Sequence, residues 1–374
     1  MRLLKQLFFV FLIFSLAVPA VRGVQTIKSS KDPDDTVKIG LLIPDQNSLA
    51  AQHGAEMAIL EANRKGGLNG KPFQLVVRSM EGPWGTGSKM AVDMLFEDKV
   101  WAIMGSHDGR NAHLVEQACT KVRAVFLSSW AGDPTLSKAF VPWYFSTVPN
   151  DLQQADAFIE EIYNKEKLTR IAAVSDVGYD SKLAMESFIK KTKATGIKDP
   201  VQFIYDDSGK DFTTLLDQIN KADTRCIVLF GKPLASIKII RQMRQRKMNQ
   251  SVFGSLSLLD ENEFSDQDLN NYEGAVLVSS ANWTGSKGLS FRNEFWKIYG
   301  RLPGDVAAYA YDGMHVLIEA IKTAGLDRVE IQKAMTKTRF EGITGLIQFD
   351  EKGNRMGKAD LIKIRNGVPV AVQR

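Results

Sequence analysis

The feature that most restricts the fold of this sequence is a repeated alternation of short apolar segments with longer amphipathic ones. Short runs rich in Val, Ile and Leu predict strands, and the longer segments between them predict helices. Such an alternation is typical of a parallel sheet covered by helices on both faces. Its first run predicts strands over 37–43, 73–77, 100–104 and 124–127, and an extended segment over 140–148. It also predicts helices over 88–96 and 111–122, and an earlier helix that Ser48 can cap and that Gly66 and Gly67 end.

The alternation then restarts, and the second run has a similar length. Two such runs predict two doubly wound lobes, so the predicted fold class is α/β with two parallel sheets. The second run predicts helices over 151–166, 180–195, 212–221 and 234–248, and strands over 170–174, 201–205, 226–230, 251–254 and 275–279.

After residue 280 the alternation stops, because predicted helices and strands follow without a new βα run. These late elements must pack onto lobes that are already built, so we expect the chain to cross between the lobes more than once. They are predicted helices over 289–299, 306–324 and 329–337, and predicted strands over 347–350, 361–365 and 368–372.

The N-terminus reads as a secretory signal peptide over residues 1–23. Arg2 and Lys5 precede a twelve-residue apolar run, and a small-residue cleavage site follows at Ala20 or Gly23. The run is short for a membrane span. No cysteine follows the leader, which excludes a lipoprotein anchor, and we expect a soluble protein in the periplasm of a Gram-negative bacterium. Cys119 and Cys226 fall in different predicted lobes, so we expect two free buried thiols rather than a disulfide.

Composition narrows the function classes. Hydrophobic residues make up 44% and charged residues 24% of the 374 residues, which excludes a disordered chain, a collagen-like chain and a small disulfide scaffold. The formal net charge of +5 falls to +2 when the leader is removed, because Arg2, Lys5 and Arg22 leave with it and no acid does. A nearly neutral chain lacks the basic footprint of nucleic-acid binding, so we expect no such partner.

Ligands of open parallel sheets bind beyond the carboxyl ends of the strands. Two facing sets of such loops form a cleft at a domain interface, which is a common small-molecule site. The loops in question are 44–52, 80–87, 105–110 and 128–134 in the first run, and 175–179, 230–234 and 254–258 in the second.

Residues 105–111 (GSHDGRN) form the first candidate site. They directly precede a predicted helix, so their backbone N–H groups and the positive end of the helix dipole favour an anionic group. Ser106, His107, Asp108 and Gly109 are the candidate binding residues here. The alternative is an ordinary capped helix start with solvated polar residues.

Aromatic and charged residues in the other loops are further candidates. Trp130 is placed to stack on a flat ligand or, alternatively, to fill the core. Trp84, in the glycine-rich loop 82–87, has the same two interpretations. Tyr179 opens a helix after a strand and can reach the cleft, or it can be a surface tyrosine. Lys232 places a cation at the cleft, although a lone loop lysine is more often only solvated.

Four stretches, taken in order, resemble the type I periplasmic binding proteins, and more narrowly the branched-chain amino-acid-binding (Leu/Ile/Val) branch of ABC importers. The resemblance covers essentially the whole chain after the leader. Its individual motifs are weakly specific, but their order and spacing together are specific. The stretches are 54–71 (GAEMAILEANRKGGLNGK), 97–105 (EDKVWAIMG), 176–180 (DVGYD) and 308–314 (AYAYDGM).

The resemblance implies two Rossmann-like lobes, joined by a hinge of three crossovers, that close on a small ligand. It implies crossovers near residues 149, 280 and 348. It also implies an ABC transporter permease in the inner membrane as the partner, and we expect a monomer with no cofactor. The implied lobes are residues 37–148 with 280–347, and residues 149–279 with 348–374.

The ligand implied by the resemblance is less certain, because the chain departs from the family pattern. Amino-acid binders of this family usually hold the α-carboxylate and the α-ammonium with a Ser and a Thr, and these positions are Gly109 and Gly132 here. A second-lobe acid often holds the ammonium, whereas residues 254–256 read Gly-Ser-Leu, so Ser255 is the candidate there. Asp108 or Asp133 can pair with an ammonium. Trp84, Trp130 and Lys232 instead suit a flat carboxylate, so both ligand classes stay open.

An enzyme and a ligand sensor are the two alternative function classes. An enzyme has little support: residues 82–89 (GPWGTGSK) nearly spell a phosphate-binding loop, but a serine separates the last glycine from the lysine. His107, Asp108 and His113 do not have metal-ligand spacing, so we expect no metal. A sensor that presents its ligand to a membrane receptor remains an alternative, because the same fold serves both roles.

Overall fold

The structure, a computed structural model, describes residues 36–83, 85–138, 141–206, 208–209 and 211–372. The expected leader over residues 1–23 and the candidate Trp84 lie outside the described residues. Within this part of the chain, no helix is both long and apolar enough to cross a membrane.

The first sheet is parallel throughout and has the strand order β2-β1-β3-β4-β5. Its central strands β3 and β4 are buried on both faces, as expected of apolar runs between two helical layers. The strands are β1 (Val37–Ile43), β2 (Phe73–Ser79), β3 (Ala102–Gly105), β4 (Val125–Ser128) and β5 (Tyr144–Ser146).

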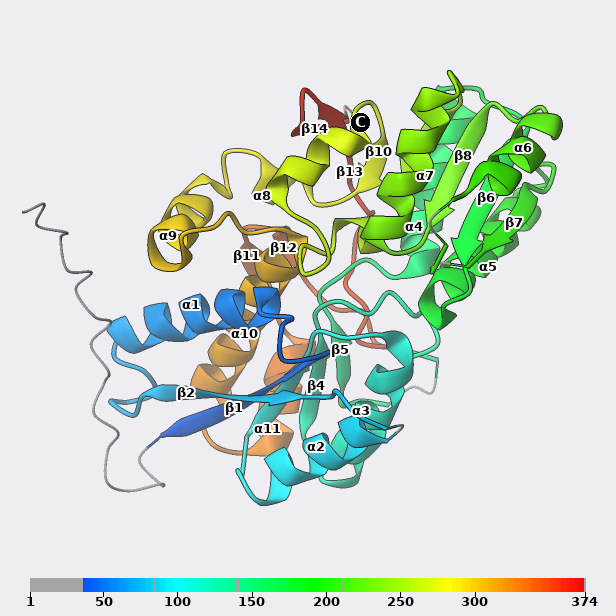
Figure 1. The fold of residues 1–374 in the computed structure, drawn as a ribbon. Coiled ribbons are helices and arrows are strands. Elements are labelled where there is room, and N and C mark those ends of the chain that lie inside the picture. Colours follow the sequence, from blue (N-terminus) through cyan, green and yellow to red (C-terminus); the bar gives the residue numbers. More distant parts are fainter. Residues whose placement is uncertain (1–35, 84, 139–140, 207, 210, 373–374) are drawn as a thin grey trace, which may run out of the picture. The chain divides into compact units, whose positions relative to one another are not determined.

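Helices cover both faces of this sheet (Figure 1). Helices α1 (Ala50–Arg64) and α10 (Asp305–Ala324) pack on one face, and α2 (Thr86–Phe96) and α3 (Gly109–Lys121) pack on the other. Gly54 allows α1 and α10 to pack closely, because a Cβ there would lie 2.2 Å from the carbonyl oxygen of Ala307. Helix α9 (Leu289–Tyr299) lies against α1, and α11 (Arg328–Thr336) follows α10.

The second sheet has the order β14-β13-β10-β9-β8-β6-β7. The run from β10 to β7 is parallel, whereas β13 and β14 pair antiparallel at one edge. The strands are β6 (Ile171–Asp176), β7 (Val201–Tyr205), β8 (Cys226–Phe230), β9 (Ser251–Gly254), β10 (Val276–Val278), β13 (Leu361–Arg365) and β14 (Val368–Ala371).

Helices also cover both faces of the second sheet (Figure 1). Helices α4 (Asp151–Ile159) and α5 (Tyr179–Ala194) pack on one face, and α6 (Thr213–Lys221) and α7 (Pro233–Gln245) on the other. A π-helical turn, η2 (Glu160–Lys165), continues α4, and 3-10 turns η3 (Leu256–Leu259) and η4 (Asp266–Tyr272) follow β9.

These two helix-covered sheets confirm the predicted α/β class and most of its elements. The chain leaves the first sheet after β5, returns to it with α10 after the short α8 (Ala281–Thr284), and re-enters the second sheet at β13. The expected strand over 347–350 is wrong in its bounds. The structure has β12 (Gly345–Ile347) paired with β11 (Phe340–Gly342), and the sequence patterns did not predict β11. Cys119, in α3, and Cys226, in β8, are both buried free thiols.

Candidate functional site

A cavity of about 500 Å³ lies where the carboxyl ends of the two parallel sheets face each other. Loops after β1, β3 and β4 line it from the first sheet, and loops after β6, β8 and β9 from the second. Five candidates from the sequence are brought together in its wall: His107, Asp108, Trp130, Tyr179 and Lys232. Ligands of open parallel sheets bind at this place, so the cavity is the candidate site.

Asp108 caps the helix that begins at the cavity. Its Oδ1 accepts the backbone N–H of Asn111 at 3.0 Å, and its Oδ2 accepts the Asn111 side-chain amide at 2.6 Å. Asp108 is therefore the N-cap of α3, as the alternative of an ordinary capped helix start predicts. The buried His107 stacks on Phe126, and burial lowers its pKa, so its ring is neutral at pH 7.

The N–H of Gly109, at the positive end of α3, is bound by Asp180 at the start of α5. Gly109 donates to Oδ1 and Oδ2 of Asp180 at 3.1 and 3.2 Å. The anion expected at residues 105–111 is thus a carboxylate of the same chain. Burial, together with the charge of Asp108, raises the pKa of Asp180 to about 7. The sequence patterns did not single out Asp180, although it lies in the quoted stretch 176–180.

Asp133 lies beside the cavity at the centre of a second set of hydrogen bonds. Its Oδ2 accepts from the Tyr179 hydroxyl at 3.1 Å and lies 3.2 Å from Nε2 of His113. Its Oδ1 accepts both the N–H and the hydroxyl of Thr135. Burial raises the pKa of Asp133, but hydrogen bonds from His113 and Thr135 outweigh burial and lower the pKa overall. The carboxylates of Asp133 and Glu116 raise the pKa of His113 to about 9, so this imidazole is charged at pH 7.

Gly132 and Ser255 lie outside the cavity wall. A Cβ on Gly132 would lie 2.5 Å from Oδ1 of Asp151, the first residue of α4, so Asp151 fills the space beside Gly132. Burial raises the pKa of Asp151 well above its usual range. Ser255 exchanges a hydrogen bond with Ser257, which does line the cavity. Ser106 is buried behind the wall, and its N–H donates to the carbonyl of Leu42.

Trp130 and Lys232 both line the cavity, and each also has neighbours in its own chain. Trp130 lines the cavity and also packs against the apolar clusters of both sheets, so it has a core contact, and stacking on a ligand stays a prediction. Lys232 lines the cavity next to Asp260. Burial raises the pKa of Asp260, and the Lys232 ammonium partly opposes this rise.

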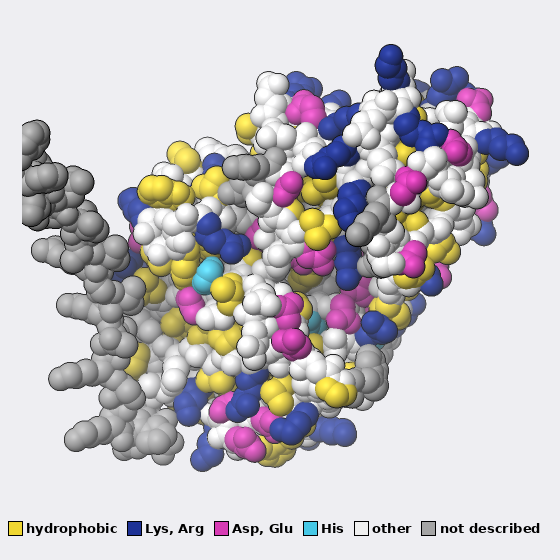
Figure 2. Space-filling view, viewed as in Figure 1, with side chains coloured by type: hydrophobic (Ala, Val, Ile, Leu, Met, Phe, Trp, Pro, Cys, Tyr) yellow, Lys and Arg dark blue, Asp and Glu magenta, His cyan; other side chains and the backbone are white. Residues whose placement is uncertain are grey.

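Acidic side chains outnumber basic ones in the wall. Figure 2 shows Asp and Glu side chains near the middle of the face in view, with Lys and Arg side chains there and toward its edges. Arg110 lies over the ring of Tyr179, with its guanidinium carbon 5.7 Å from the ring centre. The wall carboxylates are those of Asp45, Asp108, Asp176, Asp180, Asp260 and Glu263, against the two cations Arg110 and Lys232.

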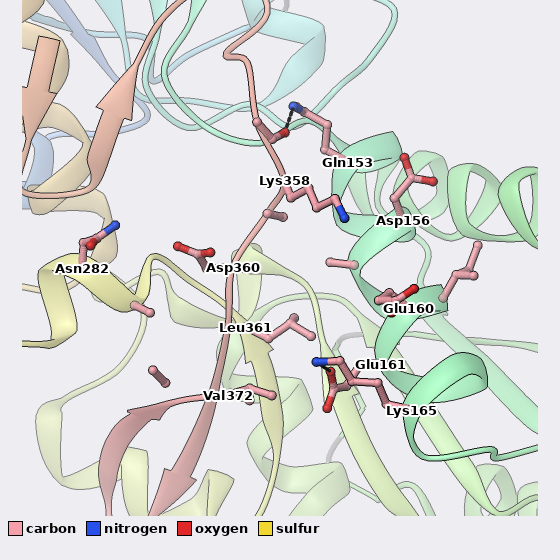
Figure 3. A pocket seen from close by; sticks show the side chains of 16 residues that line it. Gln153, Asp156, Glu160, Glu161, Lys165, Asn282, Lys358, Asp360, Leu361 and Val372 are labelled. Atoms are coloured by element: carbon pink, nitrogen blue, oxygen red, sulfur yellow. Dashed lines mark hydrogen bonds and ion pairs between the residues drawn. The ribbon is translucent and has the colours of Figure 1, made fainter. Parts of the chain in front are cut away.

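A larger cavity, of about 830 Å³, lies between α4 with η2 and the segment that enters β13 (Figure 3). Gln153 donates to the carbonyl of Gly357 at 2.9 Å, and Lys165 pairs with Glu161 at 3.0 Å. None of the residues predicted as candidates lines this cavity. It also lies away from the carboxyl ends of the parallel strands, so we do not assign it as the ligand site.

Comparison with known proteins defines the class. The family model described as periplasmic binding protein matches residues 36–364, so the chain belongs to this family. The chain is 26% identical over 355 residues to Leu/Ile/Val-binding protein homolog 1 of Brucella melitensis, which covers 90% of this chain and 91% of that protein. The resemblance predicted from the sequence is thereby confirmed.

Solved structures agree on the fold. The branched-chain amino acid substrate-binding protein LivJ of Streptococcus pneumoniae, in complex with isoleucine, superposes with a TM-score of 0.79 at 22% identity, covering 91% of this chain and all of that chain. A solute-binding protein of R. palustris in complex with benzoate superposes with a TM-score of 0.76 at 17% identity, covering 90% of this chain and 95% of that chain. Within the described residues no group of three or more His, Cys, Asp or Glu is arranged to hold a metal.

Proposed function

We propose that this chain is a secreted solute-binding protein that captures a small organic ligand between two closing lobes and delivers it to an ABC importer. In this proposal residues 1–23 are a cleaved signal peptide and the mature protein works in the periplasm as a monomer. Residues 37–148 with 280–347 form one lobe, and residues 149–279 with 348–374 form the other. The role is binding rather than catalysis.

The observation that supports this proposal best is the cavity between the facing strand ends. Its wall comes from both sheets, so a ligand there touches both lobes at once. Two hydrogen-bonded pairs also join the sheets at its edge, Tyr179 with Asp133 and Gly109 with Asp180. A ligand that adds contacts to both walls favours the closed arrangement, and the partner then distinguishes loaded from empty protein by shape.

The names and bound ligands of related proteins support a small organic solute. One is named for Leu, Ile and Val, and the solved neighbours hold isoleucine or benzoate. All of these solutes are small organic molecules that fit a cavity of this size. Each of these three kinds of solute also carries a carboxylate.

A sensor that presents the loaded form to a membrane receptor is the second candidate, because closure produces the same signal for either partner. Reconstitution separates the two. Loaded protein that stimulates the ATPase of a permease complex in vesicles supports import, whereas binding to a receptor domain without such stimulation supports sensing.

The first test is native mass spectrometry of the mature protein, with identification of any small molecule released on denaturation. Small-angle scattering is then recorded with and without that molecule, or with hits from a thermal-shift screen of amino acids, carboxylates and amines. We expect a 1:1 complex and a smaller radius of gyration in the loaded state. A protein that binds no member of these classes, and that never becomes more compact, contradicts solute capture.

A further inference from the structure

The cavity carries an acceptor that its own chain does not satisfy. Asp176, at the end of β6, is 1% exposed and lines the wall. Its Oδ1 accepts the N–H of Gly178 at 2.7 Å, but its Oδ2 has no hydrogen-bond partner among the described residues. Its neighbour in the wall is Gly231, where even a Cβ would lie only 3.3 Å from Oδ2. A buried carboxylate oxygen without a donor is costly, so this position favours a ligand that brings one.

The anion site predicted at the start of α3 is already occupied by a side chain of this chain. The N–H of Gly109 at the positive end of α3 already donates to Asp180. A ligand carboxylate would have to displace that side chain and then face Asp108 nearby. Space at Gly109 is also limited, because a Cβ there would lie 2.7 Å from the Cβ of Asp133 and 3.0 Å from Asp180.

The basic groups of the wall are engaged with side chains of this chain. Arg110 lies over the Tyr179 ring, and the charge of Lys232 acts on Asp260. The wall therefore holds six carboxylates and two cations. Asp180 is affected by this crowding. Burial and the charge of Asp108 raise its pKa to about 7. Positive charge in the cavity relieves that repulsion.

We propose that the solute is an organic cation that carries N–H donors and no carboxylate, such as a primary amine or a guanidine, with its cationic group on Asp176. This inference rests on the proposed solute-binding function and specifies its ligand class. Primary ammonium and guanidinium groups supply the N–H donor that Oδ2 of Asp176 lacks, whereas a quaternary ammonium supplies only charge.

Titration calorimetry of the full mature chain tests the proposal with five probes. Putrescine and agmatine are N–H cations without a carboxylate, choline is a cation without an N–H donor, and leucine and benzoate carry carboxylates. We expect putrescine or agmatine to bind at 1:1, choline to bind at least about tenfold more weakly, and leucine and benzoate to give no binding heat.

Variants then locate the cationic group. Asp176→Asn keeps an oxygen for Gly178 and removes the charge, so amine binding should weaken about 10- to 100-fold. The matched control is Asp199→Asn, at an exposed acid whose recorded ion pair is with Lys193, and it should leave the affinity unchanged. If circular dichroism shows that Asp176→Asn does not fold, Glu263→Gln removes another wall charge and should also weaken amine binding.

Failure of the cation proposal can be distinguished from failure of the solute-binding proposal. Binding of leucine or benzoate without binding of either amine overturns the cation class and leaves solute capture intact. Absence of amine binding overturns the cation class in any case, and the released-ligand and scattering measurements then decide solute capture separately. Equal weakening by Asp176→Asn and Asp199→Asn would also overturn the assignment of Asp176.

Discussion

The hydroxyl of Tyr179 donates a hydrogen bond to Oδ2 of Asp133, 3.1 Å away, and this contact joins the loop after β6 to the loop after β4. The two residues belong to different sheets and are 46 positions apart in the chain. Asp133 is in turn held by Thr135 and His113, so the acceptor is already oriented when the tyrosine reaches it. The pair is therefore one of the links that hold the two walls of the cavity together.

Tyr179→Phe removes this link and keeps the ring under Arg110. We expect a loss of about 0.5–1.5 kcal/mol in the free energy of unfolding, the usual value for one hydrogen bond. We also expect a larger radius of gyration for the ligand-free protein, because one contact between the walls is gone. Urea denaturation and small-angle scattering measure the two effects. An unchanged scattering profile would show that the bond does not help to hold the walls together.

Trp130→Ala should reduce both stability and ligand affinity, because the indole packs on two apolar clusters and also lines the cavity. The expected loss of unfolding free energy is about 3 kcal/mol, at the lower end for a tryptophan truncation because the side chain is only half-buried. Trp130→Phe should lose less of both. Trp296→Ala is the control, since Trp296 is 57% exposed and should change neither quantity by more than about 0.5 kcal/mol. Full affinity in a destabilised Trp130→Ala variant would assign the residue to the core alone.

His113 should make the protein lose stability in mildly alkaline solution. Its folded pKa of about 9 lies above the ordinary value of 6.5, because Asp133 and Glu116 favour the charged ring. The folded state then holds a proton that the unfolded state has lost. The stabilisation is complete below about pH 6.5 and disappears as the pH rises through 9. His113→Gln should flatten this part of the stability profile, measured by urea denaturation from pH 6 to pH 10. An identical slope in the variant would contradict the assignment.

Arg355 should stabilise the segments of chain that pass between the two sheets. Its guanidinium donates to the carbonyls of Thr147, Thr344 and Leu346, which lie close to the passages between the sheets. Arg355→Lys keeps the charge but loses the planar fork, so we expect a loss of about 2 kcal/mol in unfolding free energy. Faster hydrogen exchange at residues 344–347 should accompany it. Arg339→Lys, at an exposed position, is the control. Equal stability of the two variants would show that these bonds contribute little.

Much of the architecture could be predicted from the sequence because its signals are local. Apolar runs such as β8 (Cys226–Phe230) and the glycines after α1 mark where elements begin and end, and the predicted bounds of many elements differ from the observed ones by only a few residues. The rule that ligands bind beyond parallel strand ends then placed His107, Trp130, Tyr179 and Lys232 around one cleft. The structure brings these four residues into one wall.

Only the tertiary structure decided which side chains are in contact across the cleft. Asp180 reaches the N–H of Gly109 over 71 positions, and Asp151 fills the space beside Gly132. No periodicity encodes these contacts, because they depend on how the two sheets are docked. The sequence by itself determined two βα runs, the loops at their strand ends and the family. The docking of the sheets decided the chemistry of the cavity, since it brings six carboxylates together and lets one of them occupy the anion site at the start of α3.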